Sequence, residues 1–184
     1  MPIDAEDRRL LLRVAREAIA AHVERRPAAS PPIAGALAGP AGAFVSLHHG
    51  GDLRGCIGHI EADQRLGDVV SRCAVAASSS DPRFPAVGPG ELAAIDIEIS
   101  VLGPLEPITG PDEIEIGRHG LVVESGWHRG LLLPQVALEW KWDRDTFLAQ
   151  TCRKAGLAPD AWRTARAVRL WRFEAEVFSE GQEG

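Results

Sequence analysis

Tyrosine is absent from this chain of 184 residues, and lysine occurs only as Lys141 and Lys154, so arginine supplies nearly all of the positive charge. Mechanisms that use a tyrosine acid or a lysine Schiff base are therefore disfavoured, because few or no candidate side chains exist. The 3 cysteines include no CxxC pair, which argues against a disulfide framework and against a structural zinc site. We expect free thiols and predict neither a bound metal nor a cofactor.

The chain also lacks an excess of basic residues and any long apolar run. Its formal net charge is −6 and its basic residues are scattered, which disfavours nucleic acid as a partner. No apolar run approaches the length that crosses a bilayer, and the first residues, "MPIDAEDRRL", are acidic and polar, unlike a signal peptide. We therefore predict a cytoplasmic globular protein that binds neither nucleic acid nor a membrane.

Helical spacing of apolar residues marks several segments. Asp4 is placed to cap a helix that runs to about Arg25. Apolar residues at positions 66 to 77 recur at intervals of three and four, which predicts a second helix with Cys73 in its buried stripe. A third helix is expected to start at Asp143 or Asp145, to bury Cys152 and to end near residue 156.

Alternating patterns predict strands between these helices. "AFVSLHHGGDLRGCIGHI" indicates two strands joined by a tight turn at Gly50-Gly51-Asp52. Further strands are expected in "IDIEISV", in the pair "HGLVVES" and "RGLLLP", and in the terminal "ARAVRLWRFEAEVF". Hairpins with interspersed helices, but without a repeating βαβ order, favour an α+β fold with a largely antiparallel sheet flanked by helices.

The segment "LRGCIG" contains the main candidate for chemistry. Cys56 is a candidate nucleophile, and Arg54 could lower the pKa of the thiol or grip a carboxylate or phosphate. Gly55 and Gly58 permit close approach or unusual backbone angles, and unpaired N–H groups in such a turn can bind an anion. The alternative is that Cys56 is a small buried apolar residue in a strand whose glycines mark a bulge.

The base that would serve Cys56 depends on the register of the hairpin. In a regular strand Cys56 and Arg54 share one face while His59 lies on the other, so His59 is a poor base. His48 or His49 across the hairpin is an alternative, and a shift of one residue decides which of them faces the thiol.

Four residues outside this segment complete the candidate site. In "SSSDPRFP", Arg83 could bind an anionic group that Asp81 orients, or the two could form an ordinary surface ion pair. Glu98, with Asp96, could line a polar pocket or face water. His119 in "GRHGLVV" is the candidate acid or base, although a hydrogen-bonded loop histidine is the simpler interpretation.

Taken together and in order, six segments resemble the AMMECR protein family, in its prokaryotic form AmmeMemoRadiSam system protein A. The segments are "FVSLHHGGDLRGCIGHI", "SSSDPRF", "ISVL", "GRHGLVV", "LLLPQVALEWKWDRDTFLAQTCRKAGL" and "FEAEVFSE". "LRGCIG" is the signature of that family, whereas His59 departs from the small polar residues usual there.

The resemblance implies one AMMECR-like domain over residues 1–184. Residues 1–42 would form the N-terminal helix and its connection and 43–180 the signature-bearing core, with a small appended subdomain. It also implies a Memo-like protein and a radical-SAM enzyme as partners. The leading hypothesis is a thiol-nucleophile hydrolase or transferase acting on a small anionic or carbonyl substrate. The alternatives are a non-catalytic module that binds a ligand or these partners and, less favoured, a nucleotide- or RNA-binding protein.

Overall fold

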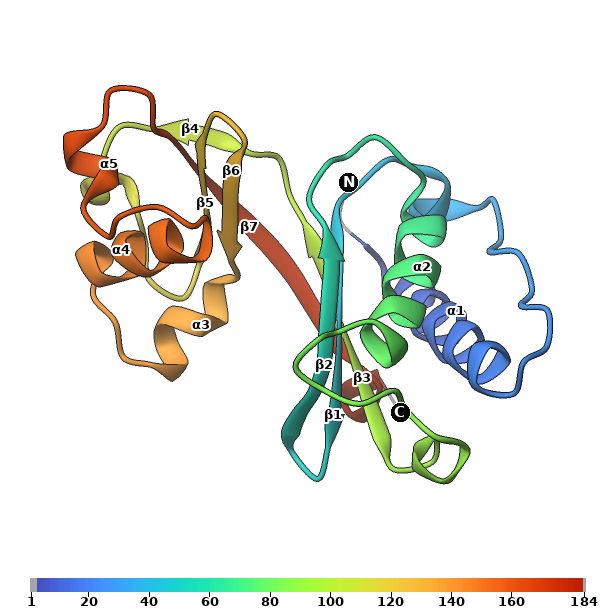
Figure 1. Ribbon diagram of the computed structural model, residues 1–184. Coiled ribbons are helices and arrows are strands. Elements are labelled where there is room, and N and C mark those ends of the chain that lie inside the picture. Colours follow the sequence, from blue (N-terminus) through green and yellow to red (C-terminus); the bar gives the residue numbers. More distant parts are fainter. Residues whose placement is uncertain (1–2, 184) are drawn as a thin grey trace. The chain divides into compact units, whose positions relative to one another are not determined.

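A computed structural model describes residues 3–183 and divides the chain into two compact units (Figure 1). The first unit contains the chain up to Leu102 together with its C-terminal segment from Glu176, and the second contains Gly103–Ala175. Helices and antiparallel strands occur in both units, so the predicted α+β class is confirmed. Among the described residues, no helix is both long and apolar enough to cross a bilayer.

In the first unit, α1 and α2 pack on one face of strands ordered β2-β1-β3 (Figure 1). As predicted, the Asp4 side chain caps α1 by accepting a hydrogen bond of 2.8 Å from Asp7 N–H, and Cys73 is buried on α2. Burial raises the pKa of the Cys73 thiol to about 11. The elements are α1 Ala5–Val23, η1 Gly35–Ala38, β1 Ala43–His49, β2 Asp52–His59, α2 Leu66–Ser79, η2 Pro89–Glu91, β3 Ile95–Leu102 and α6 Glu180–Glu183.

The β1–β2 hairpin has the tight turn that the sequence predicts and one irregularity that it does not. Gly50 and Gly51 have φ angles of 61° and 91°, and a two-residue hairpin turn with both angles positive favours glycine. Further along, Leu47 is paired with Gly55 but His48 with Leu53. Arg54 is therefore an extra residue on β2, which makes a β-bulge and shifts the register of the rest of the strand.

Pairing with β3 separates an apolar face from a polar one. Val45 pairs with Ile99 and Leu47 with Ile97, and all four are fully buried in the core with α1 and α2. The alternating residues Ser46 and Glu98, which are also paired, lie on the opposite face. We call that face, which carries Ser46, His48, Cys56, Asp96, Glu98 and Ser100, the polar face of the sheet.

The second unit packs short helices against strands ordered β7-β5-β6, with β4 paired to β7 (Figure 1). The predicted β5–β6 hairpin is present, and so is the helix with Cys152 in its buried stripe, capped by Asp143. The sequence patterns did not indicate β4, α3 or α5. The elements are β4 Glu106–Ile108, η3 Pro111–Glu113, β5 His119–Ser125, β6 His128–Leu132, α3 Pro134–Glu139, α4 Arg144–Lys154, α5 Ala161–Thr164 and β7 Arg169–Ser179.

The end of β7 and the helix after it belong to the first unit, where they are fastened to α1. Arg8 Nε donates a hydrogen bond of 3.0 Å to Glu176 Oε1, and Arg16 Nε donates one of 3.0 Å to Glu180 Oε1. Glu180 Oε2 also accepts the backbone N–H of Ile97 at 3.1 Å. These contacts tie the first and last segments of the chain to β3.

Candidate functional site

Cys56 lies directly opposite Ser46 on β1, and the Ser46 hydroxyl donates a hydrogen bond to its sulfur, with Oγ and Sγ 3.2 Å apart. The backbone N–H of Cys56 points away from β1, because it donates to Asp81 Oδ2 at 2.9 Å. Ser46 and Cys56 are therefore a non-hydrogen-bonded pair of the ladder, the type in which side chains approach most closely. The thiol is half-buried on the polar face of the sheet.

Asp81 and Arg83 close the outer edge of β2 beside Cys56. The two oxygens of Asp81, which is 4% exposed, accept 4 hydrogen bonds: one from Cys56 N–H, one from Arg83 N–H and two from the Arg83 guanidinium. The guanidinium and the backbone donors hold the pKa of Asp81 well below its ordinary value. Asp81 thus holds Arg83 in place through an ion pair, a contact that both sequence interpretations share.

Arg83 combines this fixed position with an accessible surface. Its Nη2 lies 2.7 Å from Asp81 Oδ2 and 3.5 Å from the Cys56 carbonyl oxygen. Half of the side chain is exposed, and Nη1 makes no hydrogen bond to any residue that the structure describes. The geometry leaves this nitrogen available to a ligand next to Cys56.

Arg54, by contrast, is engaged within the protein. Its Nε and Nη2 donate to the two oxygens of Glu91 at 3.0 and 3.3 Å, and Nη1 donates to the Pro85 carbonyl at 2.8 Å. The side chain is only 13% exposed, and its charge lowers the pKa of Glu91. In this arrangement Arg54 fastens the bulge to residues 85–91.

Gly55 and Gly58 are required for close packing. A Cβ atom at Gly55 would lie 2.2 Å from the carbonyl oxygen of Ala77 on α2, and one at Gly58 would lie 2.3 Å from the Phe44 ring. Neither is among the glycines with positive φ. The Cys56 N–H is already bonded to Asp81, so it does not contribute to the anion-binding backbone considered from the sequence.

The register also decides which histidine shares a face with Cys56. Alternation along β1 places His48 on the same face as Ser46, whereas His49 is on the other. His59 is bonded to Asp63, with Nε2 and Oδ1 2.7 Å apart, and alternation places it on the face opposite Cys56. His48 Nε2 and Ser100 Oγ are buried without a hydrogen-bond partner among the described residues.

Glu98 occupies the position on β3 opposite Ser46, so Cys56, Ser46 and Glu98 form one row across three strands. His119 belongs to the second unit, where it begins β5 and is 6% exposed. Its Nδ1 accepts the backbone N–H of Glu115 at 3.0 Å. Burial lowers the pKa of His119, and the nearby charges of Arg172 and Arg118 lower it further.

Ser46 and Glu91 make contacts in the candidate site that the sequence patterns missed. No composition or motif identifies Glu91 as the partner of Arg54, because the two are far apart in the chain. Ser46 would have been found only if the bulge at Arg54 had been known, since a regular hairpin from the same turn would place Val45 opposite Cys56.

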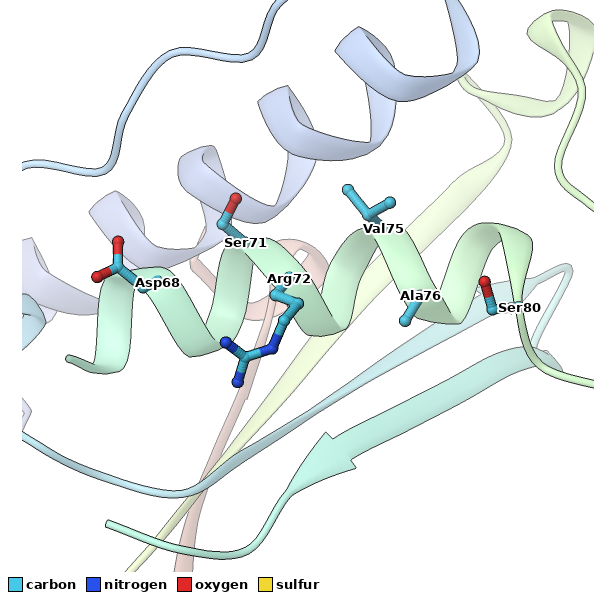
Figure 2. A pocket seen from close by; sticks show the side chains of 6 residues that line it. All are labelled: Asp68, Ser71, Arg72, Val75, Ala76 and Ser80. Atoms are coloured by element: carbon cyan, nitrogen blue, oxygen red, sulfur yellow. The ribbon is translucent and has the colours of Figure 1, made fainter. Parts of the chain in front are cut away.

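Some hollows lie away from these residues. One of about 420 Å³ runs along α2 and is lined by Asp68, Ser71, Arg72, Val75, Ala76 and Ser80 (Figure 2). It includes none of the predicted site residues. Within residues 3–183, no three His, Cys, Asp or Glu side chains are grouped so as to hold a metal ion.

The chain is similar to several archaeal proteins over nearly its whole length. A protein of Methanothermobacter thermautotrophicus is 44% identical over 97% of each chain, and Protein TK0174 of Thermococcus kodakarensis is 42% identical over 92% of this chain and 88% of its own. The crystal structure of the uncharacterised protein PH0010 from Pyrococcus horikoshii superimposes with a TM-score of 0.88 at 39% identity, covering 94% of this chain and 91% of that one. The AMMECR1 family model matches residues 12–178. The chain therefore belongs to the AMMECR1 family.

Proposed function

We propose that the protein is an enzyme in which Cys56 is the nucleophile toward a small anionic or carbonyl substrate. The observation that carries this proposal is the hydrogen bond from the Ser46 hydroxyl to the Cys56 sulfur. A donor directed at sulfur favours the charged thiolate, and a thiolate is the reactive form of cysteine. The guanidinium of Arg83 beside the Cys56 carbonyl adds positive charge on the edge of β2.

The remaining predicted residues have distinct parts in this proposal. Arg83 Nη1 binds the anionic group of the substrate or the oxyanion that forms from its carbonyl, and Asp81 keeps the guanidinium in place. Glu98 contacts the substrate from the far end of the row. Arg54, Gly55 and Gly58 support the site through packing and tethering rather than through direct contact. His119, the acid or base considered from the sequence, belongs to the second unit, so no step at Cys56 is assigned to it.

The reaction follows the general course of thiol catalysis. The Cys56 sulfur forms a bond to the carbonyl carbon, and the carbonyl oxygen becomes an oxyanion facing Arg83. The bond to the leaving group then breaks and the leaving group takes a proton. Water, or a second acceptor, then attacks the thioester carbon, the carbon–sulfur bond breaks, the acyl group leaves on the acceptor, and the Cys56 sulfur takes up a proton to restore the thiol.

Alkylation with iodoacetamide at a series of pH values tests the thiol directly. Cys73 and Cys152 are buried in the two cores, so Cys56 is expected to react first and at a pH below that of an ordinary thiol. Ser46→Ala is expected to move the alkylation profile to higher pH by removing the donor to sulfur. A profile typical of an unperturbed thiol, unchanged in the Ser46→Ala protein, would contradict the proposal.

A non-catalytic binding module is the second candidate. Two contacts within the "LRGCIG" segment favour it, because Arg54 is bound to Glu91 and Gly55 packs closely against α2. Both residues thus stabilise the fold and are not free to contact a substrate. Cys56→Ser separates the two functions. Partner assembly is expected to survive this change in either case, whereas turnover is lost only if Cys56 is a nucleophile.

We also propose that the protein acts in the cytoplasm with a Memo-like protein and a radical-SAM enzyme. The resemblance of its ordered motifs to the AmmeMemoRadiSam system supports these partners. Co-purification of the three tagged proteins from one expression host measures the association. Failure of the full-length chain to retain either partner would count against it.

A further inference from the structure

We infer that the second unit has a binding pocket of its own, which takes a small zwitterion of the amino-acid type with its carboxylate directed at His119. The pocket is a hollow of about 430 Å³. It lies entirely within Gly103–Ala175 and so does not depend on Cys56. Its walls come from β4, η3, the segment before β5, the start of α4, and β7, and they are Glu106, Asp112, Glu113, Ile114, Glu115, Arg118, His119, Arg144, Arg172 and Glu174.

The lining residues differ in depth. His119 is 6% exposed and Ile114 only 1%, so these two residues form the floor. The side chains of Glu115, Arg118 and Glu174 are each about three-fifths exposed and lie at the opening. A ligand group that reaches the floor would therefore lose most of its contact with water, whereas a group at the opening would stay hydrated.

His119 is held in the orientation of a hydrogen-bond donor. Because Nδ1 accepts the backbone N–H of Glu115, the proton of the neutral ring must be on Nε2. In the described part of the chain no residue bonds to Nε2. The lowered pKa of His119 favours this neutral form near pH 7. An N–H that lines a pocket and has no partner within the protein is a suitable donor to a carboxylate.

The guanidinium of Arg172 is the positive charge that acts most strongly at the floor. Arg172 is fixed by Glu106, with Nε and Oε2 2.9 Å apart, and by the carbonyl of Glu113, 2.6 Å from Nη1. Among the charged groups near His119, Arg172 has the largest electrostatic effect on the ring, whereas Arg118 is paired with Glu115 and Glu174 at the opening. An anionic group at the depth of His119 is therefore favoured.

The opening has the opposite character. Five carboxylate side chains line the pocket, those of Glu106, Asp112, Glu113, Glu115 and Glu174, and all five residues are exposed. An ammonium group is favoured at this level, whereas phosphate, with its higher charge and no cation, is disfavoured. A molecule with a carboxylate and a nearby ammonium group therefore matches the pocket, because the carboxylate can bind at the floor and the ammonium group at the opening.

Nuclear magnetic resonance of the His119 ring in the full-length protein tests the inference. The twenty free α-amino acids are titrated one by one, alongside inorganic phosphate. At least one amino acid is expected to shift the His119 ring resonances at concentrations up to roughly 10 mM, a weak but specific affinity. Its methyl ester, which lacks the carboxylate, and its N-acetyl form, which lacks the ammonium group, are each expected to bind about tenfold more weakly, the loss of one charged contact.

Variants distinguish this pocket from a general effect on the fold. His119→Phe removes the donor and should weaken binding by about tenfold or more. Arg166→Gln, at an exposed position of the same unit outside the pocket, should leave it unchanged. Cys56→Ser should also bind normally, so the proposed enzyme can fail without affecting this result. No shift with any amino acid, or equal binding of the methyl ester or phosphate, would overturn the inference.

Discussion

Asp81 Oδ2 lies 2.7 Å from Arg83 Nη2 and at the same time accepts the backbone N–H of Cys56. A carboxylate that joins an exposed guanidinium to a strand edge fixes the position of both. The same oxygen therefore links the accessible guanidinium of Arg83 to the backbone of Cys56, the proposed nucleophile.

Asp81→Asn is expected to destabilise the protein by about 2 kcal/mol, because a buried acceptor loses its charge and one oxygen becomes a donor facing N–H groups. The half-exposed Arg83 adds little to this figure because water screens it. Urea unfolding at pH 7 measures the change, with Asp52→Asn at an exposed position as the control.

The Asp81 contribution should depend on pH. Its pKa is lowered in the folded protein from an ordinary value of 3.8, so the stabilisation is fully present above that value and is lost as the pH falls through the folded-state pKa. The difference in unfolding free energy between the original protein and Asp81→Asn should therefore shrink between pH 5 and about pH 2. A constant difference over this range would show that the charge of Asp81 does not stabilise the fold.

Arg54→Ala is expected to cost about 1 to 2 kcal/mol, since it leaves Glu91 and the Pro85 carbonyl without their donor. Hydrogen exchange should accelerate mainly in residues 85–91, which Arg54 fastens to β2. Arg65→Ala is the matched control, because Arg65 pairs with Asp68 on an exposed surface. Equal losses of stability in the two variants would mean that the contacts of Arg54 stabilise the fold no more than an exposed ion pair does.

Gly55→Ala should be among the most damaging small substitutions, on the order of 3 kcal/mol, because the new methyl group would meet the rigid backbone of α2. Gly90→Ala provides the comparison, since nothing lies within 4 Å of a Cβ atom there. Thermal unfolding of both variants measures the contrast. If Gly55→Ala were as stable as Gly90→Ala, the close contact between β2 and α2 would be wrong.

Glu180→Gln is expected to lower stability by about 1 kcal/mol by removing the charge that joins Arg16 to the N–H of Ile97. The C-terminal segment should then be cut faster by a carboxypeptidase. Glu139→Gln, on the exposed end of α3, controls for the change in net charge. Unaltered cleavage would show that other contacts hold this segment.

Local patterns predicted most of the elements. Asp4 and Asp143 cap helices because each is a short acceptor just before an amphipathic run, and Gly50-Gly51 gives the hairpin because both residues can take positive φ. Cys73 and Cys152 were placed in the core by helical spacing alone. In these cases the residues that form the pattern in the sequence are the same residues that stabilise the helix or the turn.

The candidate site was less predictable because its geometry depends on distant segments. "LRGCIG" points to Cys56, but the partner of the sulfur depends on the bulge at Arg54, which no local pattern distinguishes from a regular strand. Arg54 was expected to grip a ligand, and its partner Glu91 is 37 residues further along the chain. Short elements such as β4 have too few residues for a recognisable period.

The β-bulge inserts one residue, Arg54, into β2 between the turn at Gly50-Gly51 and Cys56. If Arg54 were deleted, the ladder could continue without interruption and Gly55 and Cys56 would keep their neighbours Leu47 and Ser46. The hydrogen bonds from Arg54 to Glu91 and to the Pro85 carbonyl would be lost. Removing one residue from the hairpin would thus separate two features of "LRGCIG". The position of the Cys56 sulfur beside Ser46 would remain, and the attachment of residues 85–91 to β2 would be lost.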